Sequence, residues 1–551
     1  MSAATDQNSV AGIPEWLRSA VIYGVFPPSF RDANGDGIGD LPGIVEKLDY
    51  FTELGVDVLW LNPVFDSPFE DGGYDVSDFY RVAPRYGTNE DLERLFAEAG
   101  RRGIRVLLDF VAGHTSIRHP WFQQSARAEP TPYSNWYIWT DHIFAPCGEK
   151  FIGGLSPRSG RYHANFFYFQ PSLNYGYAHP RESWQLPVDH PDVLAMKEEM
   201  RRVMTFWLDK GAAGFRVDLA STLIKDEMGG EALKEYWRDV REWIDRAYPD
   251  RALVAEWSSP EDAIDAGFHV DFALHCNGDA YNSLFRMETG TNVLPGAGNS
   301  YFRREGKGDI TPFMEWFETH ARGMGGRGFL SIPSGNHDLP RLSYRRNPSE
   351  QKVALAFVLT MPGVPSLYYG DEIGLRYQPD LPSKEGAYLR TGSRTPMQWD
   401  PSPNAGFSTA DPADLYLPID PASDRPTVEG QRDDPDSIWR LVQALLKLRR
   451  EHRCLRADGG FAPLYAEPHA YPFVFERTAE QERMIVALNP SAEPARAGFT
   501  WPEDRATPTA IEIGTAPEIF RDGPRLILDL APVSFCVLEA LPPSPRLHPR
   551  A

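Results

Sequence analysis

Asp218, Glu256 and Asp338 are acidic residues that lie at or just beyond the ends of short apolar runs typical of buried strands. Two carboxylates flanking the anomeric carbon of a sugar can cleave a glycosidic bond, because one attacks the carbon and the other protonates the leaving oxygen. Arg216 lies two residues before Asp218, so both side chains point to the same face of a strand. We therefore expect the guanidinium to keep Asp218 ionised, as a nucleophile must be; a buried ion pair that only closes the fold is the alternative.

The neighbours of Glu256 favour the complementary role. This residue follows the apolar run Ala252–Ala255 and precedes Trp257. Burial against such neighbours raises the pKa of a glutamic acid, which suits a group that must donate a proton. The spacing therefore predicts Asp218 as the nucleophile and Glu256 as the acid.

Eight short apolar runs, separated by stretches of helical periodicity, are the predicted strands that position these acids. They are Val21–Phe26, Val58–Leu61, Arg105–Val111, Gly214–Leu219, Ala252–Ala255, His269–Leu274, Phe329–Ile332 and Val364–Tyr369. Apolar strands that alternate with helices indicate an α/β fold whose parallel sheet is covered on both faces. We predict a (β/α)8 TIM barrel, with a doubly wound open sheet as the alternative. In a barrel the acids gather at the C-terminal face.

The clearest helical pattern lies between residues 189 and 211, where apolar side chains recur every three or four positions. Asp189 is the predicted N-cap, Pro191 suits the first turn, and Gly211 ends the helix. Similar periodicity covers Leu41–Leu54 and Ser437–Arg450. These helices fall between the predicted strands or after the last of them, as the barrel requires.

Two segments depart from this alternation. Residues 113–188 are rich in Pro, Tyr, His and Asn, show no helical period and are too long for an ordinary loop, which predicts an inserted subdomain after strand three. Near the C-terminus, short apolar runs at 471–475, 484–488, 510–513 and 533–538 lie between Pro- and Gly-marked turns, which predicts a β-sandwich. The predicted division is therefore barrel 1–112 and 189–457, subdomain 113–188 and C-terminal domain 458–551.

The composition limits the classes of partner. The 551-residue chain is 42% hydrophobic and 24% charged, and its net charge of −21 repels phosphate backbones and anionic lipids, so we expect no nucleic-acid or membrane partner. No signal peptide and no run long enough to span a bilayer are visible, which predicts a cytoplasmic protein. Scattered cysteines predict neither a zinc site nor a disulfide framework: Cys147, Cys276, Cys454 and Cys536.

Eight segments, in order along residues 20–455, resemble those of the α-amylase family of glycoside hydrolases, particularly its oligo-1,6-glucosidase and α-glucosidase branch. They are RDANGDGIGDLPGI (31–44), GGYDVSDFY (72–80), DFVAGHTSIRHPWF (109–122), QPSLN (170–174), GFRVD (214–218), AEW (255–257), SGNHDLPR (334–341) and SRTPMQWD (393–400). The resemblance implies a retaining, exo-acting α-glucosidase that hydrolyses short oligosaccharides or disaccharides through a covalent glycosyl-enzyme. It implies no organic cofactor.

The same resemblance implies roles for individual residues. Asp218 is the nucleophile, Glu256 the acid and later the base, and Asp338 the acid that grips the sugar 2- and 3-hydroxyls. The implied sugar-binding residues beside them are Tyr74, Asp75, His114, Arg216, His337 and Arg394. Within this set, Tyr74 stacks on the ring, while Asp75 and Arg394 hold the 4- and 6-hydroxyl end and make the site a pocket. Core packing is the alternative for Tyr74 and for both histidines.

The loop Asp32–Asp40 places oxygen-bearing side chains at alternate positions, with glycines between them, as a loop that wraps Ca2+ does. The family resemblance adds the Ile38 carbonyl, so the predicted structural Ca2+ ligands are Asp32, Asn34, Asp36, Ile38 and Asp40. A metal-free turn is the alternative.

The chain also departs from the family pattern at three positions. Gly113 replaces a usual Asn, so we expect no second calcium, and Ser172 replaces a usual Asp in QPSLN. Leu219 follows the predicted nucleophile and matches neither the Val of 1,6-acting nor the Thr of 1,4-acting relatives, which leaves linkage open. Residues 404–418 and 428–437 resemble trehalose-synthase-like enzymes, so a transglycosylase or isomerase is the alternative. A catalytically dead binding subunit is a remote one, and the oligomeric state stays undecided.

Overall fold

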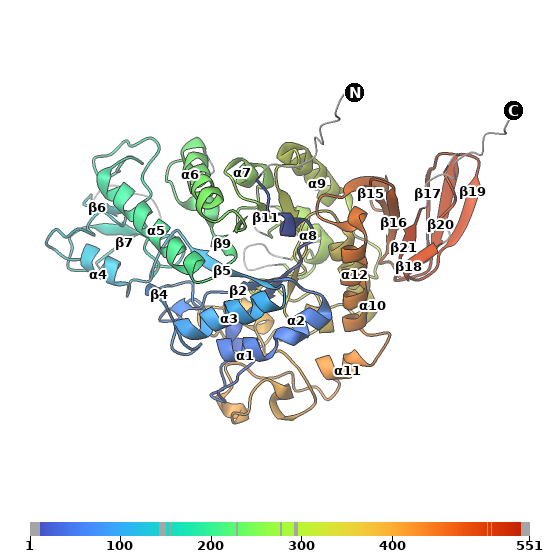
Figure 1. The fold of residues 1–551 in the computed structure, drawn as a ribbon, viewed down its shortest axis with the longest axis horizontal. Coiled ribbons are helices and arrows are strands. Elements are labelled where there is room, and N and C mark those ends of the chain that lie inside the picture. Colours follow the sequence, from blue (N-terminus) through green and yellow to red (C-terminus); the bar gives the residue numbers. More distant parts are fainter. Residues whose placement is uncertain are drawn as a thin grey trace.

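Eight parallel strands form the centre of the molecule in the computed structural model, which describes residues 12–142, 150–154, 156–227, 230–275, 278–290, 296–503, 505–508 and 510–540 (Figure 1). In sheet order they are β12 (Phe329–Ser331), β11 (Val270–Phe272), β10 (Ala252–Ala255), β9 (Gly214–Asp218), β5 (Arg105–Val111), β2 (Val58–Leu61), β1 (Ile22–Val25) and β13 (Ser366–Tyr368). All eight predicted strands are therefore confirmed, with ends that differ by two residues or fewer.

The two ends of this strand order meet, which decides between a barrel and an open sheet. Pro333, just beyond β12, forms a parallel bridge with Ser366 of β13. The backbone N–H of Val364 also donates to the carbonyl of Leu330 at 2.9 Å. The fold is therefore the predicted (β/α)8 barrel and not the doubly wound alternative.

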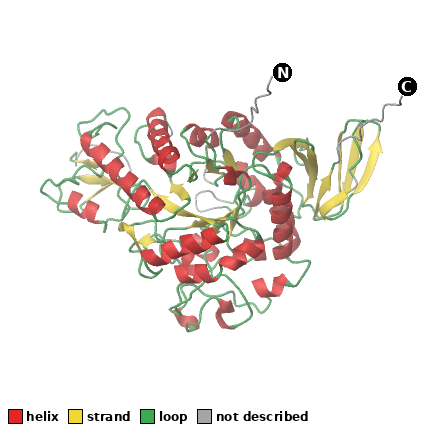
Figure 2. Cartoon of the chain, in the orientation of Figure 1, coloured by secondary structure: helices red, strands yellow, loops and turns green. Residues whose placement is uncertain are grey.

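Helices surround the strands (Figure 2). They are α1 (Leu41–Glu46), α2 (Leu48–Leu54), α3 (Asn89–Arg101), α5 (Pro191–Asp209), α6 (Glu231–Ala247), α7 (Pro260–Asp265), α8 (Asp279–Phe285), α9 (Thr311–Met324), α10 (Pro348–Thr360), α11 (Val428–Arg432) and α12 (Ile438–Glu451). Two predictions about helix ends were wrong. The N-cap of α5 is His190, whose Nδ1 accepts from the N–H of Asp192, and not Asp189. The single helix expected over Leu41–Leu54 is divided at Lys47.

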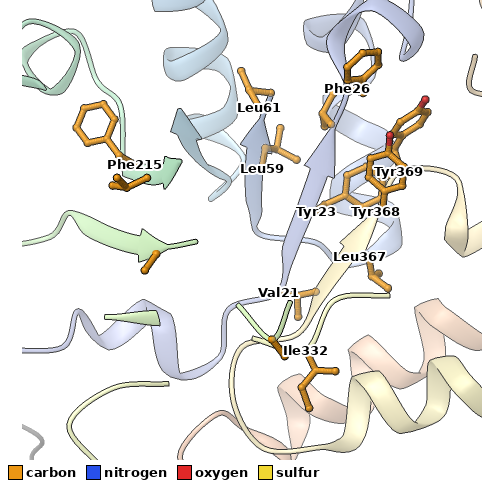
Figure 3. Packing of buried hydrophobic residues seen from close by; sticks show 14 of the residues in the cluster. Val21, Tyr23, Phe26, Leu59, Leu61, Phe215, Ile332, Leu367, Tyr368 and Tyr369 are labelled. Carbon is orange, nitrogen blue, oxygen red and sulfur yellow. The ribbon is translucent and has the colours of Figure 1, made fainter. Parts of the chain in front are cut away.

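Alternate residues of the strands pack into two different cores. Tyr23, Leu59 and Leu367 face outward toward the helices, and Figure 3 shows these side chains gathered around β1, β2 and β13. Trp60 belongs to the second cluster and fills the barrel interior, where Gly24 on the neighbouring strand leaves it room, because a Cβ there would lie 3.3 Å from the indole ring. The strands therefore read as continuous apolar runs because both of their faces are buried.

The segment between β5 and α5 carries a small sheet of its own: β6 (Trp139–Thr140), β8 (Arg161–His163) and β7 (Phe151–Gly153). A six-residue helix, α4 (Pro120–Ser125), precedes it, although no helical period was recognised there. Nearer the barrel, β3 (Phe65–Asp66) pairs with β4 (Asp78–Val82). The limits 113–188 stay a prediction, and Figure 1 places β6 and β7 on the side of the barrel opposite the C-terminal strands.

The C-terminal strands form two antiparallel sheets with an apolar layer between them. One contains β14 (Gly460–Tyr465), β15 (Phe473–Ala479), β16 (Glu482–Asn489), β21 (Ser534–Glu539) and β18 (Ala510–Gly514), and the other β17 (Ala495–Thr500), β20 (Arg525–Leu530) and β19 (Glu518–Asp522). Val474, Ile485, Trp501 and Leu528 belong to the layer between them, so this region has the predicted sandwich form. Sequence reasoning missed β14, β17, β19 and β20, while the boundary at residue 458 stays a prediction.

Two further predictions concern cysteines and the membrane. Cys454 and Cys536 are buried free thiols, as expected, whereas Cys147 and Cys276 lie outside the described residues. Within the ranges given above, no helix is both long enough and apolar enough to cross a bilayer.

Outside the barrel wall, Glu372 is a buried acid that accepts hydrogen bonds from the hydroxyls of Tyr23 and Tyr50, both at 2.6 Å. Burial raises the pKa of Glu372 to about 7, so the folded chain holds this proton more tightly than the unfolded chain. Its contribution to the free energy of unfolding, roughly 3 kcal/mol, is therefore complete below about pH 4. This contribution is lost as the pH rises through about 7. Glu372→Gln should remove this loss, measured by denaturant titration at pH 5, 6 and 7. The exposed Glu429→Gln serves as control, and equal pH dependence in all three proteins would contradict the assignment.

Candidate active site

Arg216 lies at the centre of the acidic cluster. It projects from β9 into the barrel, where its Nη1 contacts Asp109 Oδ1 at 2.8 Å and Asp218 Oδ1 at 3.0 Å, and its Nη2 contacts Glu256 Oε1 at 2.6 Å. The guanidinium also lies over the ring of Trp60, 5.0 Å from its centroid. The same-face prediction for Arg216 and Asp218 is confirmed, and each of the three ion pairs orients an acid.

Asp218 and Glu256 are close enough to hydrogen-bond each other, and the second Glu256 oxygen accepts from the N–H of Leu219 at 3.0 Å. Burial and the nearby charge of Glu256 raise the pKa of Asp218 well above its usual value, and Arg216 opposes this shift without overcoming it. The expectation that Arg216 alone keeps Asp218 ionised was therefore wrong, because one cation faces three carboxylates.

Asp338 lies in the opposite electrostatic environment. Its Oδ1 contacts Arg390 Nη1 at 2.7 Å and Arg394 Nη2 at 3.3 Å, and its Oδ2 lies 3.3 Å from His337 Nε2. Burial opposes the charge, but His337 and the two guanidinium groups outweigh it and hold the pKa of Asp338 below its usual range. The pKa values of Asp338 and Asp218 are therefore shifted in opposite directions.

A chain of hydrogen bonds orients the aromatic floor of the site. The ring of Tyr74 stacks on His337 with centroids 5.2 Å apart, and its hydroxyl donates to Asp109 at 2.9 Å. Asn62 Nδ2 lies 3.0 Å from both the Tyr74 hydroxyl and His337 Nδ1. Burial lowers the pKa of His337 to about 3, so the ring is neutral near pH 7 and donates from Nε2 toward Asp338. Sequence reasoning noted Asp109 only as a strand-end acid and missed its ion pair with Arg216.

His114 is also a buried neutral imidazole, since burial lowers its pKa to about 3. Asn165 of the insertion approaches its Nδ1 at 3.0 Å, which leaves Nε2 as the donor. Such a donor is suited to a sugar hydroxyl. A Cβ at Gly113 would lie 2.9 Å from Asn165 Nδ2, so the small residue at this position makes room for that contact.

We call the hollow around Asp218, Glu256 and Asp338 the acidic cup. Asp75 lies away from this cup, contrary to the sugar-binding role that the resemblance implied. It is fully buried, and its carboxylate accepts from the hydroxyl of Ser67 and from the N–H groups of Glu70 and Asp71. Asp75 therefore stabilises the turn before it.

Asp71 and Arg390, which sequence reasoning missed, form an ion pair at 3.3 Å. Arg390 also contacts Asp338. Arg394 is fully buried, and its Nε donates to the carbonyl of His337 at 3.0 Å. Each missed residue lies four positions before the predicted one. Two features of the sequence could have indicated these residues: the adjacent acids Glu70 and Asp71, and Arg390, which lies four residues before the Arg of RTPMQW.

The predicted calcium ligands lie in one loop between β1 and α1: Asp32, Asn34, Asp36, Ile38 and Asp40. Oxygen donors suit Ca2+. However, Asp32 accepts from the N–H of Gly35 at 2.7 Å, and Asp40 caps α1 by accepting from Gly43 at 2.7 Å. Among the described residues, no three His, Cys, Asp or Glu side chains are grouped to hold a metal. In this arrangement the Asp32 and Asp40 carboxylates accept hydrogen bonds from their own loop and helix, and bound Ca2+ stays a prediction.

A TIM barrel with paired carboxylates at the C-terminal ends of its strands is typical of glycoside hydrolases. The alpha amylase catalytic-domain family matches residues 24–458. The chain therefore belongs to the α-amylase family of glycoside hydrolases and is an enzyme of that class.

Curated relatives with two kinds of printed activity match most of the chain. Glucan 1,6-alpha-glucosidase of Streptococcus pneumoniae serotype 4 is 33% identical over 530 residues, covering 87% of this chain and 92% of the relative. Trehalose synthase/amylase of Mycobacterium tuberculosis is 32% identical over 539 residues, covering 88% and 84%. Among solved structures, an isomaltulose synthase mutant from Erwinia rhapontici NX5 in complex with D-glucose superposes with a TM-score of 0.80 at 25% identity, covering 96% and 100%. Hydrolases and isomerases thus share this architecture.

Replacing Arg390 by Ala should lower kcat/KM for α-glucosides by about 100-fold, since removing one partner of a buried ion pair costs roughly 3 kcal/mol. The loss should appear mainly in KM, because Asp71 and Asp338 lose their orientation, and the acidic limb of the pH–rate profile should move up as the pKa of Asp338 rises. Steady-state kinetics from pH 4 to 8 measure both effects. Arg496→Ala, which removes a 2.6 Å ion pair with Asp529 in the C-terminal sheets, should leave kcat/KM unchanged. Equal effects of the two variants would contradict a role for Arg390 in the site.

Proposed function

We propose that this protein is a retaining, exo-acting α-glucosidase that hydrolyses short oligosaccharides by double displacement. The observation that carries the proposal is the pairing of Asp218 and Glu256 within hydrogen-bonding distance on the same guanidinium. A small separation between the two carboxyl groups favours a retaining mechanism, since an inverting enzyme needs room for a water molecule between acid and base.

The proposed mechanism gives the two acids different roles, with Asp218 as the nucleophile and Glu256 as the acid. Asp218 attacks C1 while Glu256 protonates the leaving oxygen; water then gives a proton to Glu256, attacks C1 and displaces Asp218. Asp338, kept anionic by Arg390 and Arg394, accepts hydrogen bonds from sugar hydroxyls and stabilises the positive charge that develops at the ring. His114 Nε2 supplies a further donor.

The exo action in this proposal rests on the Asp71–Arg390 pair. This ion pair closes one side of the acidic cup, next to Asp338. A guanidinium and a carboxylate offer donors and acceptors to terminal hydroxyls, and they obstruct a polysaccharide chain that would continue through the site. Arg394 contacts Asp338 beside this ion pair.

The second candidate is a glucosyl transferase or sugar isomerase, which the similarity to trehalose synthases and to isomaltulose synthase supports. Hydrolysis and transfer use the same acids and differ only in whether water or a sugar meets the covalent intermediate. One product analysis separates them: after incubation with maltose, isomaltose, trehalose and sucrose, hydrolysis yields monosaccharides, whereas transfer yields new disaccharides.

Asp218→Asn should reduce kcat by on the order of 10⁴-fold or more, since no covalent intermediate can form. Glu256→Gln should impair natural disaccharides far more than aryl glucosides with good leaving groups, because only the former need a proton. Circular dichroism should show an unchanged fold for both, and the exposed Asp49→Asn should keep full activity. An unaltered kcat in the first variant, or equal losses on both substrates in the second, would refute these roles.

The structural Ca2+ in the loop Asp32–Asp40 is a proposal supported by the donor chemistry and opposed by the observed hydrogen bonds. If the loop binds Ca2+, the melting temperature should fall on chelation and recover when Ca2+ is added back. Asp36→Ala should abolish this dependence, since Asp36 is exposed and its loss leaves the core unchanged. A melting temperature unaffected by chelation would remove the metal from this loop.

A further inference from the structure

Asp271 is a fully buried acid on β11, and it lies directly opposite Ala255 of the neighbouring strand β10. Val270 and Phe272 on either side of it fill the barrel interior, so its own side chain points the other way, toward the helices. There α7 packs on β11 (Figure 1). A strand face covered by a helix normally carries apolar side chains, so an acid at this position needs a physical reason.

The carboxyl group of Asp271 holds the backbone that follows Glu256. Its Oδ1 accepts from the N–H of Trp257 at 3.0 Å. Burial raises the pKa of Asp271 well above its usual range, and three backbone N–H groups that donate to the carboxyl group oppose this shift: those of Trp257, Ser258 and Phe272. Two of these donors belong to the residues directly after Glu256. The buried acid therefore binds the turn that carries Glu256.

A second contact holds the same turn to the residues after β11. Ser258 Oγ accepts from the N–H of Leu274 at 3.1 Å. The backbone of Ser258 has φ 61°, in the left-handed region that a residue with a side chain rarely adopts. Such strain persists only where the surroundings fix the conformation, and it gathers beside functional sites. The contacts with Asp271 and Leu274 fix it here.

This turn decides where the carboxyl group of Glu256 lies. On the side toward β9, the N–H of Glu256 donates to the carbonyl of Val217 at 3.1 Å, which continues the strand ladder. On the side toward β11, Trp257 and Ser258 leave the ladder through the strained turn. A general acid must meet the leaving oxygen within hydrogen-bonding reach, so a change in this turn displaces the group that donates the proton.

We propose that Asp271 is a positioning residue, which fixes the turn after β10 and so aims Glu256 at the leaving oxygen of the glycosidic bond. This inference rests on the proposed function, in which Glu256 is the acid. Asp271 lies on the face of the sheet opposite to the barrel interior, so it takes no part in the proton transfer itself. Its removal therefore impairs the steps that need Glu256 and leaves the attack by Asp218 unchanged.

The test compares two substrates that differ in their need for an acid. Cleavage of maltose or isomaltose requires a proton on the leaving oxygen, whereas dinitrophenolate leaves a dinitrophenyl α-glucoside without one. Asp271→Ala should lower kcat/KM for the disaccharide by about 100-fold, because a misplaced acid loses most of its contribution. It should lower kcat/KM for the aryl glucoside by no more than about threefold, since this ratio reports the first displacement alone and Asp218 keeps its place.

Two further variants show which contact matters. Asp271→Asn keeps an oxygen for the N–H of Trp257, so kcat/KM for both substrates should stay within about threefold of the parent value. Ser258→Ala removes the second contact of the turn and should lower kcat/KM for the disaccharide alone, by about tenfold. This variant carries the test if circular dichroism shows that Asp271→Ala does not fold.

Asp57→Ala is the matched control. Asp57 also accepts from a backbone N–H, that of Val21 at 2.8 Å, but it lies at the opposite end of the barrel. Its replacement should leave kcat/KM for both substrates unchanged.

Several outcomes would overturn the inference. Equal losses on both substrates would mean that Asp271 only stabilises the fold, and unchanged values in Asp271→Ala and Ser258→Ala would mean that the turn does not aim the acid. An Asn variant as impaired as the Ala variant would exclude the hydrogen bond to Trp257 as the cause. If the parent protein cleaves neither substrate, or if Glu256→Gln shows no selective loss on the disaccharide, the proposed function fails instead, so the two failures are distinguishable.

Discussion

The buried guanidinium of Arg216 is the interaction on which the site depends. It faces Asp109, Asp218 and Glu256 from three neighbouring strands, and no second cation contacts this group in the described structure. Burying three acids around one cation costs free energy unless a proton reduces the charge. The raised pKa of Asp218 is therefore a consequence of burial and of the neighbouring Glu256, which the single guanidinium does not overcome.

A second set of cations fixes the charge of Asp338. His337, Arg390 and Arg394 hold the pKa of Asp338 below its usual range, whereas burial and Glu256 raise the pKa of Asp218. The site thus contains two carboxyl groups in different electrostatic environments, and burial alone would have raised the pKa of both.

The parts that select a substrate come from loops outside the barrel strands. In the insertion, Asn165 hydrogen-bonds to His114 and Gln170 hydrogen-bonds to Asp71. The loop after β13 carries Arg390, which forms an ion pair with Asp71. The loop after β13 also acts on an acid of the barrel, because Arg390 contacts Asp338. Relatives named as a glucosidase and as a trehalose synthase both match most of this chain.

The sequence by itself determined the eight strands, the three strand-end acids and the common face of Arg216 and Asp218, since apolar runs and two-residue spacing are local properties of a strand. It could not place Asp109 against Arg216, 107 residues away, or Asp71 against Arg390, 319 residues away. It also assigned the sugar 4- and 6-hydroxyl end to Asp75 and Arg394, whereas the structure pairs Asp71 with Arg390, which lie just outside the recognised segments 72–80 and 393–400. Only the closed barrel decides which of two nearby side chains faces the cup, since strand register and loop packing set that direction and sequence spacing does not.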